Sequence, residues 1–432
     1  MKPSSSSSCP SDYAAFVGID RSDYSIDLTV LDSRSRSQGH RSQSSKPSAM
    51  RDWILDLRSA FPEGRIALCI EQPCANLAAF FCQYDFLDLF LINPATFKHW
   101  REAFQPSRAK CDKTDSLGLA QLLYESHHKL PVWRPDDPLT RKLRSLVETR
   151  RTLVDTRTRV HNQLVAALKN YFPEALEISG KYLYAQLACR FLERWPTLQA
   201  LQSEDPKTIR EFYHLNGSRR PQVIEKRLAI IEEAIPLTDD DTILEASTMQ
   251  VRALVDQLNA LRKHIDRYDK AIDTHFLQHD DHLVFASLPG AGANLGSRLA
   301  ALFGTDRSRF PAPADVQKFS GIAPVTKQSG NTRLVHRRYA CPKFHRQTLL
   351  EWTGQTITRS LWSRAYYQQQ RAKGVSHYTA LRALAYKWIR IMWRCWQDRK
   401  PYCEQTYLDA LRKNGSPLVT PIDLLLADAK NS

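Results

Sequence analysis

The chain begins, after a serine-rich tail, with a pattern typical of a β-hairpin. Residues 14–20 form a short apolar run that ends on Asp20, a polar turn follows, and residues 26–31 alternate between apolar and polar side chains. A short apolar run, a turn and an alternating run predict two paired strands. The next segment, residues 33–49, is polar and rich in Ser and Arg, which favours a loop.

Two further apolar runs follow at wider spacing. Residues 65–70 and 87–92 are short and apolar throughout, as in buried strands, whereas residues 53–61 and 76–84 have the spacing of helices. Strands that alternate with helices indicate an α/β layer fold for this part of the chain.

The middle of the chain has helical periodicity over unusually long stretches. Residues 139–171 and 243–276 carry apolar side chains at three-and-four spacing, which predicts two long helices that pair as an antiparallel coiled-coil hairpin. The segment 174–241 between them predicts shorter helices and loops without assignable chemistry, and residues 131–138 hold three prolines and predict a linker. The expected divisions are a disordered tail (1–12), an α/β domain (13–135), a coiled-coil and helical domain (136–280) and a C-terminal domain (281–432).

The charge of the chain indicates a polyanionic partner. Its 432 residues include 61 Lys and Arg against 46 Asp and Glu, for a formal charge of +15. The excess is concentrated in residues 141–172, 327–346 and 359–400, and nucleic acid is the leading candidate partner. Nine scattered cysteines without a Cys-x-x-Cys pair indicate neither a zinc ribbon nor a disulfide scaffold. We expect a cytoplasmic protein, since no apolar stretch approaches membrane-spanning length.

Four acids form the first candidate site. Asp112 and Asp115 lie three residues apart before an apolar run, so a helix here would direct both carboxylates the same way. A divalent metal is the usual partner of such a pair, although acids at a helix start also favour the helix dipole without a metal. Asp20 and Glu71 each end a predicted strand. Together the four form the constellation of ribonuclease-H/RuvC-like nucleases, in which carboxylates hold two Mg²⁺ around a scissile phosphate.

A glycine-rich segment opens the C-terminal domain. Residues 288–296 read Leu-Pro-Gly-Ala-Gly-Ala-Asn-Leu-Gly and resemble a helix-hairpin-helix, in which Gly290 and Gly292 would let backbone N–H groups approach a DNA phosphate. A turn between two helices that touches no DNA explains the same pattern.

A serine in a basic field is the second candidate site. Ser329 precedes Gly330, and between residues 327 and 346 there is no acid. The basic residues of this stretch are Lys327, Arg333, Arg337, Arg338, Lys343 and Arg346. Cations lower the cost of charge building up on a phosphate under attack. A basic phosphate-binding loop with a bystander serine is the alternative.

Two further groups in the C-terminal half carry weaker signals. His336, Cys341 and His345 lack a fourth ligand, which argues against zinc. The helix predicted over residues 378–396 is dense in aromatic and basic residues. Because aromatics at helical spacing usually pack in a core, we assign its tryptophans, Trp388 and Trp393, to packing. Its cations offer a possible phosphate face, made of Arg382, Lys387, Arg390 and Arg394.

Taken together, the motifs resemble the DEDD transposases of insertion sequences, a family that includes bridge-RNA-guided recombinases and Piv-type DNA invertases. The resemblance spans residues 13 to 427 and implies an α/β RNase H/RuvC-like N-terminal domain, a long antiparallel coiled-coil insertion and a mainly helical C-terminal transposase domain with a helix-hairpin-helix-like motif. The matching motifs are Val17–Gly18–Ile19–Asp20, Glu71–Gln72–Pro73, Lys110-x-Asp112-x-x-Asp115, the basic helix ending near Asn170, Leu288–Pro289–Gly290-x-Gly292, and Gly321-x-x-Pro324 followed by Gln328–Ser329–Gly330.

The resemblance also implies roles and partners. It implies that Ser329 attacks DNA to form a covalent phosphoserine, with Ser320 as a second candidate, and that Mg²⁺ is bound by the four acids Asp20, Glu71, Asp112 and Asp115. The implied partners are donor and target DNA, a structured bridge RNA from the same element, and further copies of the chain in a dimer or tetramer whose two sites act as one composite centre. The implied location is the bacterial cytoplasm, at the nucleoid.

Two other functions fit the same residues. In the first, the protein is a metal-dependent RuvC-like nuclease or a DNA invertase, and Ser329 only binds phosphate. In the second, it is an inactive nucleic-acid-binding protein that has kept the fold, although the presence of all four acids argues against this.

Overall fold

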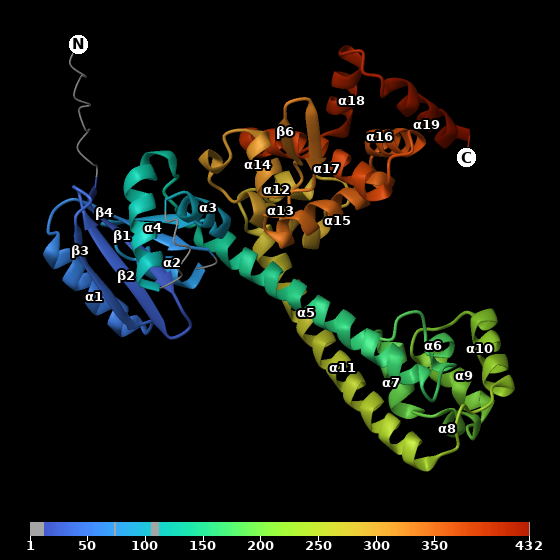
Figure 1. Cartoon of the computed structure of the whole chain (residues 1–432). Coiled ribbons are helices and arrows are strands. Elements are labelled where there is room, and N and C mark those ends of the chain that lie inside the picture. The colour runs from blue at the N-terminus through green and yellow to red at the C-terminus, as the bar shows by residue number, and fades with distance from the viewer. Residues whose placement is uncertain (1–12, 73–74, 105–111, 432) are drawn as a thin grey trace, which may run out of the picture. The chain divides into compact units, whose positions relative to one another are not determined.

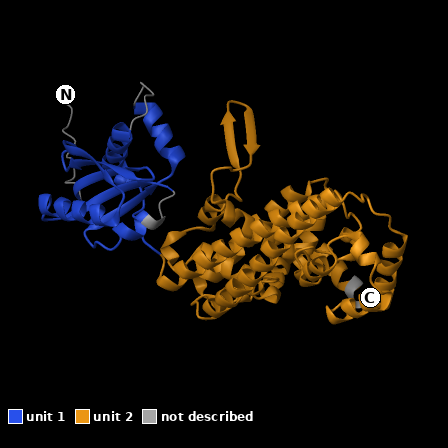
Figure 2. Cartoon of the chain, turned by 90° about the horizontal axis from the view of Figure 1, so that it is seen from below, with its two compact units in different colours: residues 1–135 blue, residues 136–432 orange. Residues whose placement is uncertain are grey.

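The computed structural model describes residues 13–72, 75–104 and 112–431 (Figure 1). The tail expected over residues 1–12 lies outside these ranges, as do Pro73 and Lys110 of the quoted motifs. The chain divides into two compact units, residues 1–135 (unit 1) and 136–432 (unit 2), which Figure 2 colours separately. Within the described ranges, no helix combines the length and apolar character needed to cross a bilayer.

Unit 1 is built on a five-stranded sheet with strand order β3-β2-β1-β4-β5. β1 pairs antiparallel with β2 and parallel with β4, and β4 pairs parallel with β5. The elements of unit 1 are β1 (Tyr13–Arg21), β2 (Ser25–Asp32), β3 (Ser37–Ser44), α1 (Pro47–Ala60), β4 (Arg65–Glu71), α2 (Ala75–Phe81), β5 (Leu87–Ile92), α3 (Pro94–Phe104), α4 (Asp112–Ser126) and the 3₁₀ turn η1 (His127–Lys129).

Helices cover both faces of this sheet. Val17 of β1 belongs to a buried cluster with Trp53 of α1 and Phe81 of α2, whereas its neighbour Phe16 belongs to a second cluster with Phe97 of α3 and Leu119 of α4. Successive strand residues point to opposite faces, so the apolar run of β1 serves two cores at once. The result is a three-layer α/β unit, as the alternation of strands and helices predicts.

The polar segment 33–49 is not the loop that we predicted. Residues Ser37–Ser44 form strand β3, which pairs antiparallel with β2, and helix α1 already begins at Pro47. β3 is an edge strand whose side chains are mostly exposed. Its pairing with β2 uses backbone hydrogen bonds alone, so its sequence needs no alternation of apolar and polar residues. Helix α3 was also not predicted, and α2 ends at Phe81 rather than near residue 84.

Unit 2 is organised around two long helices, α5 (Pro138–Lys169) and α11 (Asp241–Leu277), which lie side by side (Figure 1). Thr140 at the start of α5 bonds His279 just after α11, and Arg150 pairs with Asp269, so the two helices are antiparallel, as predicted. Coiled-coil geometry for this pair stays a prediction.

Separate groups of shorter helices pack at the two ends of this pair. Beside the end of α5 and the start of α11, one core is formed with α6 (Ala175–Ile178), α7 (Gln186–Arg194), α8 (Leu198–Gln202), α9 (Pro206–Leu215) and α10 (Pro221–Glu233). The other core lies at the opposite end and buries four tryptophans, Trp352, Trp362, Trp388 and Trp396. The elements in this part of the chain are α12 (His282–Ala286), α13 (Gly292–Phe303), η2 (Arg307–Arg309), α14 (Pro313–Phe319), β6 (Val325–Ser329), β7 (Thr332–His336), α15 (Lys343–Arg359), α16 (Leu361–Ala372), α17 (His377–Asp398), α18 (Glu404–Lys413) and α19 (Val419–Asn431).

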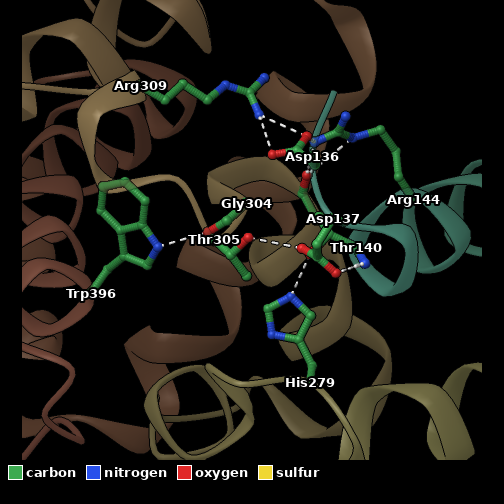
Figure 3. Close-up of polar contacts among 10 residues, drawn as sticks. Asp136, Asp137, Thr140, Arg144, His279, Gly304, Thr305, Arg309 and Trp396 are labelled. Atoms are coloured by element: carbon green, nitrogen blue, oxygen red, sulfur yellow. Dashed lines mark hydrogen bonds and ion pairs between the residues drawn. The ribbon is translucent and has the colours of Figure 1, made fainter. Parts of the chain in front are cut away.

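A polar network ties the start of α5 to the C-terminal helices (Figure 3). Asp136 pairs with Arg144 at 2.7 Å and with Arg309 at 3.1 Å, while Asp137 caps α5 and accepts a 2.8 Å hydrogen bond from Thr305. Buried His279 lies beside these groups, and burial lowers its pKa. These hydrogen bonds and ion pairs hold the start of α5 and the end of α11 in place. Each buried charge has a partner, which avoids the free-energy cost of burying it alone.

Candidate active site

Two of the predicted acids lie side by side at one end of the sheet. β1 and β4 are parallel with Ile19 opposite Ile70, so Asp20 and Glu71 end neighbouring strands at the same edge. Both line a small cleft of about 280 Å³. Side chains alternate along a strand, so both acids share the face of Phe16 and Cys69, which is covered by α4.

Helix α4 crosses β1 closely at Gly18. A Cβ atom added to Gly18 would lie 2.0 Å from the backbone oxygen of Ser116 and 2.4 Å from the backbone nitrogen of Ala120. The Ser116 hydroxyl also lies 2.8 Å from the Thr29 hydroxyl of β2. Only glycine permits this approach, which sets the stretch of α4 from Ser116 to Ala120 directly over the sheet.

The direction of α4 brings the other two acids to the same end. Tyr124, late in α4, packs its ring against Phe16, toward the beginning of β1, whereas Ser116, early in α4, lies over Gly18. The helix therefore runs opposite to β1, and its first turn, with Asp112 and Asp115, faces the end where Asp20 lies. All four predicted acids therefore lie toward the same end of the sheet.

Asp115 has a cationic partner within the protein. Its side chain is buried and accepts a 2.8 Å hydrogen bond from the Arg101 guanidinium of α3, whereas Asp112 is exposed. An arginine here supplies the positive charge that a buried carboxylate requires. The sequence gives no sign of this partner, since Arg101 lies on the helix that was not predicted.

The donor set suits a hard divalent cation, although the side chains are not gathered around one point. Carboxylate oxygens are the ligands that Mg²⁺ prefers. Among the described residues, no three His, Cys, Asp or Glu side chains are close enough together to hold a metal ion. Asp20 and Glu71 line one cleft, and the Asp115 carboxylate would have to exchange Arg101 for the metal.

Ser329 lies at the end of an exposed hairpin in unit 2. β6 and β7 form a two-stranded sheet in which Ser329 is opposite Thr332, and Gly330 takes a φ of +54° in the turn between them. Almost all side chains of the two strands are exposed, and the hairpin stands out from unit 2 in Figure 2. The serine hydroxyl is therefore accessible to a large substrate.

The cations around the serine are available to an anion. Within the described part of the chain, none of the six predicted cations between residues 327 and 346 forms an ion pair with an acid. Arg337, Lys343 and Arg346 line a groove of about 510 Å³ beside the hairpin. Burial, and then Arg337 and Arg346, lower the pKa of the nearby Arg382. Such crowding of positive charge favours a bound polyanion.

The glycine-rich segment has a packing role at one of its two predicted glycines. Gly290 has a φ of +72°, and a Cβ there would lie 2.9 Å from Gln355 Cβ on α15, so packing within the protein explains this glycine. Gly292 begins α13 and has open space beside it. Phosphate binding stays a prediction for Gly292, and α12 has only five residues, so a helix-hairpin-helix is not established.

Several other predicted residues serve the core. Ser320 is fully buried and its hydroxyl donates to Val316 O at 2.7 Å, so the structure removes it as a candidate nucleophile. Burial lowers the pKa of His345 to about 3. Trp388 is buried and Trp393 donates to Phe310 O, which confirms the assignment of both to packing.

Comparisons with known proteins agree with these motifs. Residues 17–173 match the family model of the IS110-type DEDD transposases, described as a transposase, and residues 283–368 match the transposase family of IS116, IS110 and IS902. The two matches together span more than half of the chain and hold the four acids and Ser329.

Curated relatives belong to the same kind of element. The putative transposase of the IS117 mini-circle from Streptomyces coelicolor is 29% identical over 73% of this chain and 78% of its own length. The uncharacterized 42 kDa protein of insertion element IS900 from Mycobacterium paratuberculosis is 25% identical over 72% of this chain and 77% of its own. The uncharacterized protein of IS116 from Streptomyces clavuligerus is 27% identical over 67% and 72%, respectively. The chain therefore belongs to the IS110 family of DEDD transposases of insertion elements.

Proposed function

We propose that this transposase moves its insertion element by cutting and rejoining DNA through a phosphoserine at Ser329. The observation that carries the proposal is the exposed Ser329 hydroxyl at the end of a hairpin, near six cations that form no ion pair with any acid that the structure describes. A serine in this setting can meet a phosphate that the protein has already attracted.

The chemistry balances without an external energy source. The Ser329 oxygen attacks phosphorus and gives up its proton, a new P–O bond forms, and the P–O bond to the leaving deoxyribose oxygen breaks. That oxygen takes up a proton and leaves as a hydroxyl. In the second step a hydroxyl of another DNA end attacks the phosphoserine and releases the serine. Each step exchanges one phosphate ester for another, so the bond energy is retained for rejoining.

The four acids of unit 1 would hold a divalent metal, which we propose to be Mg²⁺. Asp20, Glu71, Asp112 and Asp115 share one sheet edge, which supports this set. When bound, the metal neutralises charge on phosphate oxygens. The contribution of the chain is to keep the carboxylate oxygens at one end of the sheet. Without metal, Arg101 balances the charge of Asp115.

The proposed partners follow from the family and from charge. We propose donor and target DNA, a structured guide RNA from the same element, and a dimer or tetramer of this chain in which one site is completed by another subunit. The formal charge of +15 supports a nucleic-acid partner. The proposed place of action is the nucleoid in the bacterial cytoplasm.

The test is covalent capture with Ser329→Ala and a matched control, Thr332→Ala. Thr332 lies directly opposite Ser329 in the hairpin, so both variants remove one exposed hydroxyl at the same turn. On labelled element-end DNA with the guide RNA, we expect Ser329→Ala to abolish the protein–DNA adduct seen on a denaturing gel, and Thr332→Ala to retain it. Adduct formation by Ser329→Ala would refute the serine mechanism. Cleavage that persists in Ser329→Ala and is lost in Asp20→Ala would favour the metal-dependent nuclease.

A further inference from the structure

A groove between α17 and α18 has no role in the chemistry proposed above. Its volume is about 600 Å³, and it is lined by one face of α17, the connection after it, and α18. Four cations line it: Lys387, Arg390 and Arg394 of α17, and Lys400 of the connection. Its lining contains no Asp or Glu, although the chain has 46 of these residues, so the groove is strongly biased toward positive charge.

The positive charge of the groove is only partly neutralised. Arg394 pairs with Asp398 at 2.7 Å, but within the described residues Lys387, Arg390 and Lys400 form no ion pair. Lys387 is half-buried, and burial together with Arg390 lowers its pKa. Cations this close repel one another, and a bound anion would remove that repulsion.

The floor of the groove is apolar and firmly held. It includes Ile391, Pro401 and the rings of Tyr402 and Tyr407. The Tyr402 hydroxyl accepts a 2.9 Å hydrogen bond from the buried Trp362, and the Tyr402 ring packs against Trp388. Tyr402 and Tyr407 both pack on the tryptophan core, so this apolar part of the lining is held in place next to the four cations.

We propose that this groove binds single-stranded nucleic acid, with phosphates at the cations and an unstacked base on the apolar floor. A double helix offers phosphates, but its base faces are stacked against one another and cannot contact the apolar side chains of the groove. An unpaired strand offers both. The proposal does not depend on the phosphoserine mechanism, because it concerns binding alone, and it accepts single-stranded DNA or RNA as the source of the same chemistry.

Cys403 gives a local readout of occupancy. Its thiol is exposed, it lines the groove at the start of α18, and hydrogen bonds from Thr406 lower its pKa. Exposure and a lowered pKa both favour alkylation by iodoacetamide. The experiment measures alkylation of the Cys403 peptide by mass spectrometry in the full chain. The probes are oligothymidylate and oligouridylate of about ten nucleotides and a duplex of equal length. We expect at least one single strand to slow alkylation about tenfold, and the duplex to have little effect.

Paired variants connect the protection to the cations. Arg390→Ala with Lys400→Ala removes two exposed charges from the groove, and Lys373→Ala with Lys413→Ala removes two exposed charges outside it. We expect only the groove pair to abolish protection of Cys403, and to lower the slope of log Kd against log salt by about one to two. Equal protection by duplex, unchanged alkylation with both single strands at saturation, or equal effects of the two variant pairs would overturn the proposal. Protection by only one strand type would identify the source.

Discussion

The two candidate sites of this transposase are held in opposite ways. The acids lie at the end of a sheet whose central strands, β1 and β4, are buried on both faces, and α4 crosses that sheet with backbone contact at Gly18. Ser329 lies on a hairpin whose side chains are almost all exposed and whose turn glycine, Gly330, has open space around it. The elements that carry the acids are therefore held by the core, whereas the serine lies on a hairpin with little packing of its own.

The largest expected effect comes from adding one methyl group at each site and comparing the loss of stability. In Gly18→Ala the new Cβ collides with the backbone of α4, and we expect a loss of about 3 kcal/mol or more in local stability. In Gly330→Ala the new Cβ meets nothing within 4 Å, and the positive φ costs about 1 kcal/mol. Hydrogen exchange of peptides from β1 and α4 measures the difference. Unchanged protection in Gly18→Ala would contradict the close crossing of α4.

The second prediction tests how Asp115 is neutralised. Arg101→Met keeps the length of the side chain but leaves a buried carboxylate without its cation, and we expect a loss of about 2 kcal/mol without metal. The control is Arg41→Met. Arg41 lies on β3 of the same sheet and forms an exposed ion pair with Asp56, so its loss should lower the free energy of unfolding only slightly.

Added Mg²⁺ separates the proposed role of Asp115 from simple packing. If the metal replaces Arg101 as the partner of the acids, Mg²⁺ should raise the thermal midpoint of Arg101→Met more than that of the wild type or of Arg41→Met. Equal shifts in all three proteins would mean that Asp115 is not a metal ligand.

The contrast between the sites also explains what the sequence could predict. Apolar runs mark the buried strands, so their ends at Asp20 and Glu71, and hence the meeting of these acids, follow from pattern alone. Strand β3 and the ion pair of Arg101 do not follow, because an exposed edge strand needs no apolar alternation and the partner of a buried acid is chosen by tertiary packing. Local charge marked Ser329 only as a candidate, and its role as nucleophile is implied by the family resemblance. The residues that share its face of the hairpin follow only from the strand register.

The smallest effect concerns that register. Residues opposite or two apart in a hairpin share a face, so Lys327 lies on the face of Ser329, about 7 Å along the strand, while Arg333, opposite Gln328, lies on the other. Lys327→Ala and Arg333→Ala each remove one exposed charge and should weaken DNA affinity alike. Of these two cations, Lys327 is the one on the face from which Ser329 would attack a phosphate. We therefore expect only Lys327→Ala to slow adduct formation at saturating DNA, about tenfold. Single-turnover trapping measures this rate. An equal loss in Arg333→Ala would mean that the hairpin attracts DNA without orienting it, and the serine would then owe its reactivity to groups outside the hairpin.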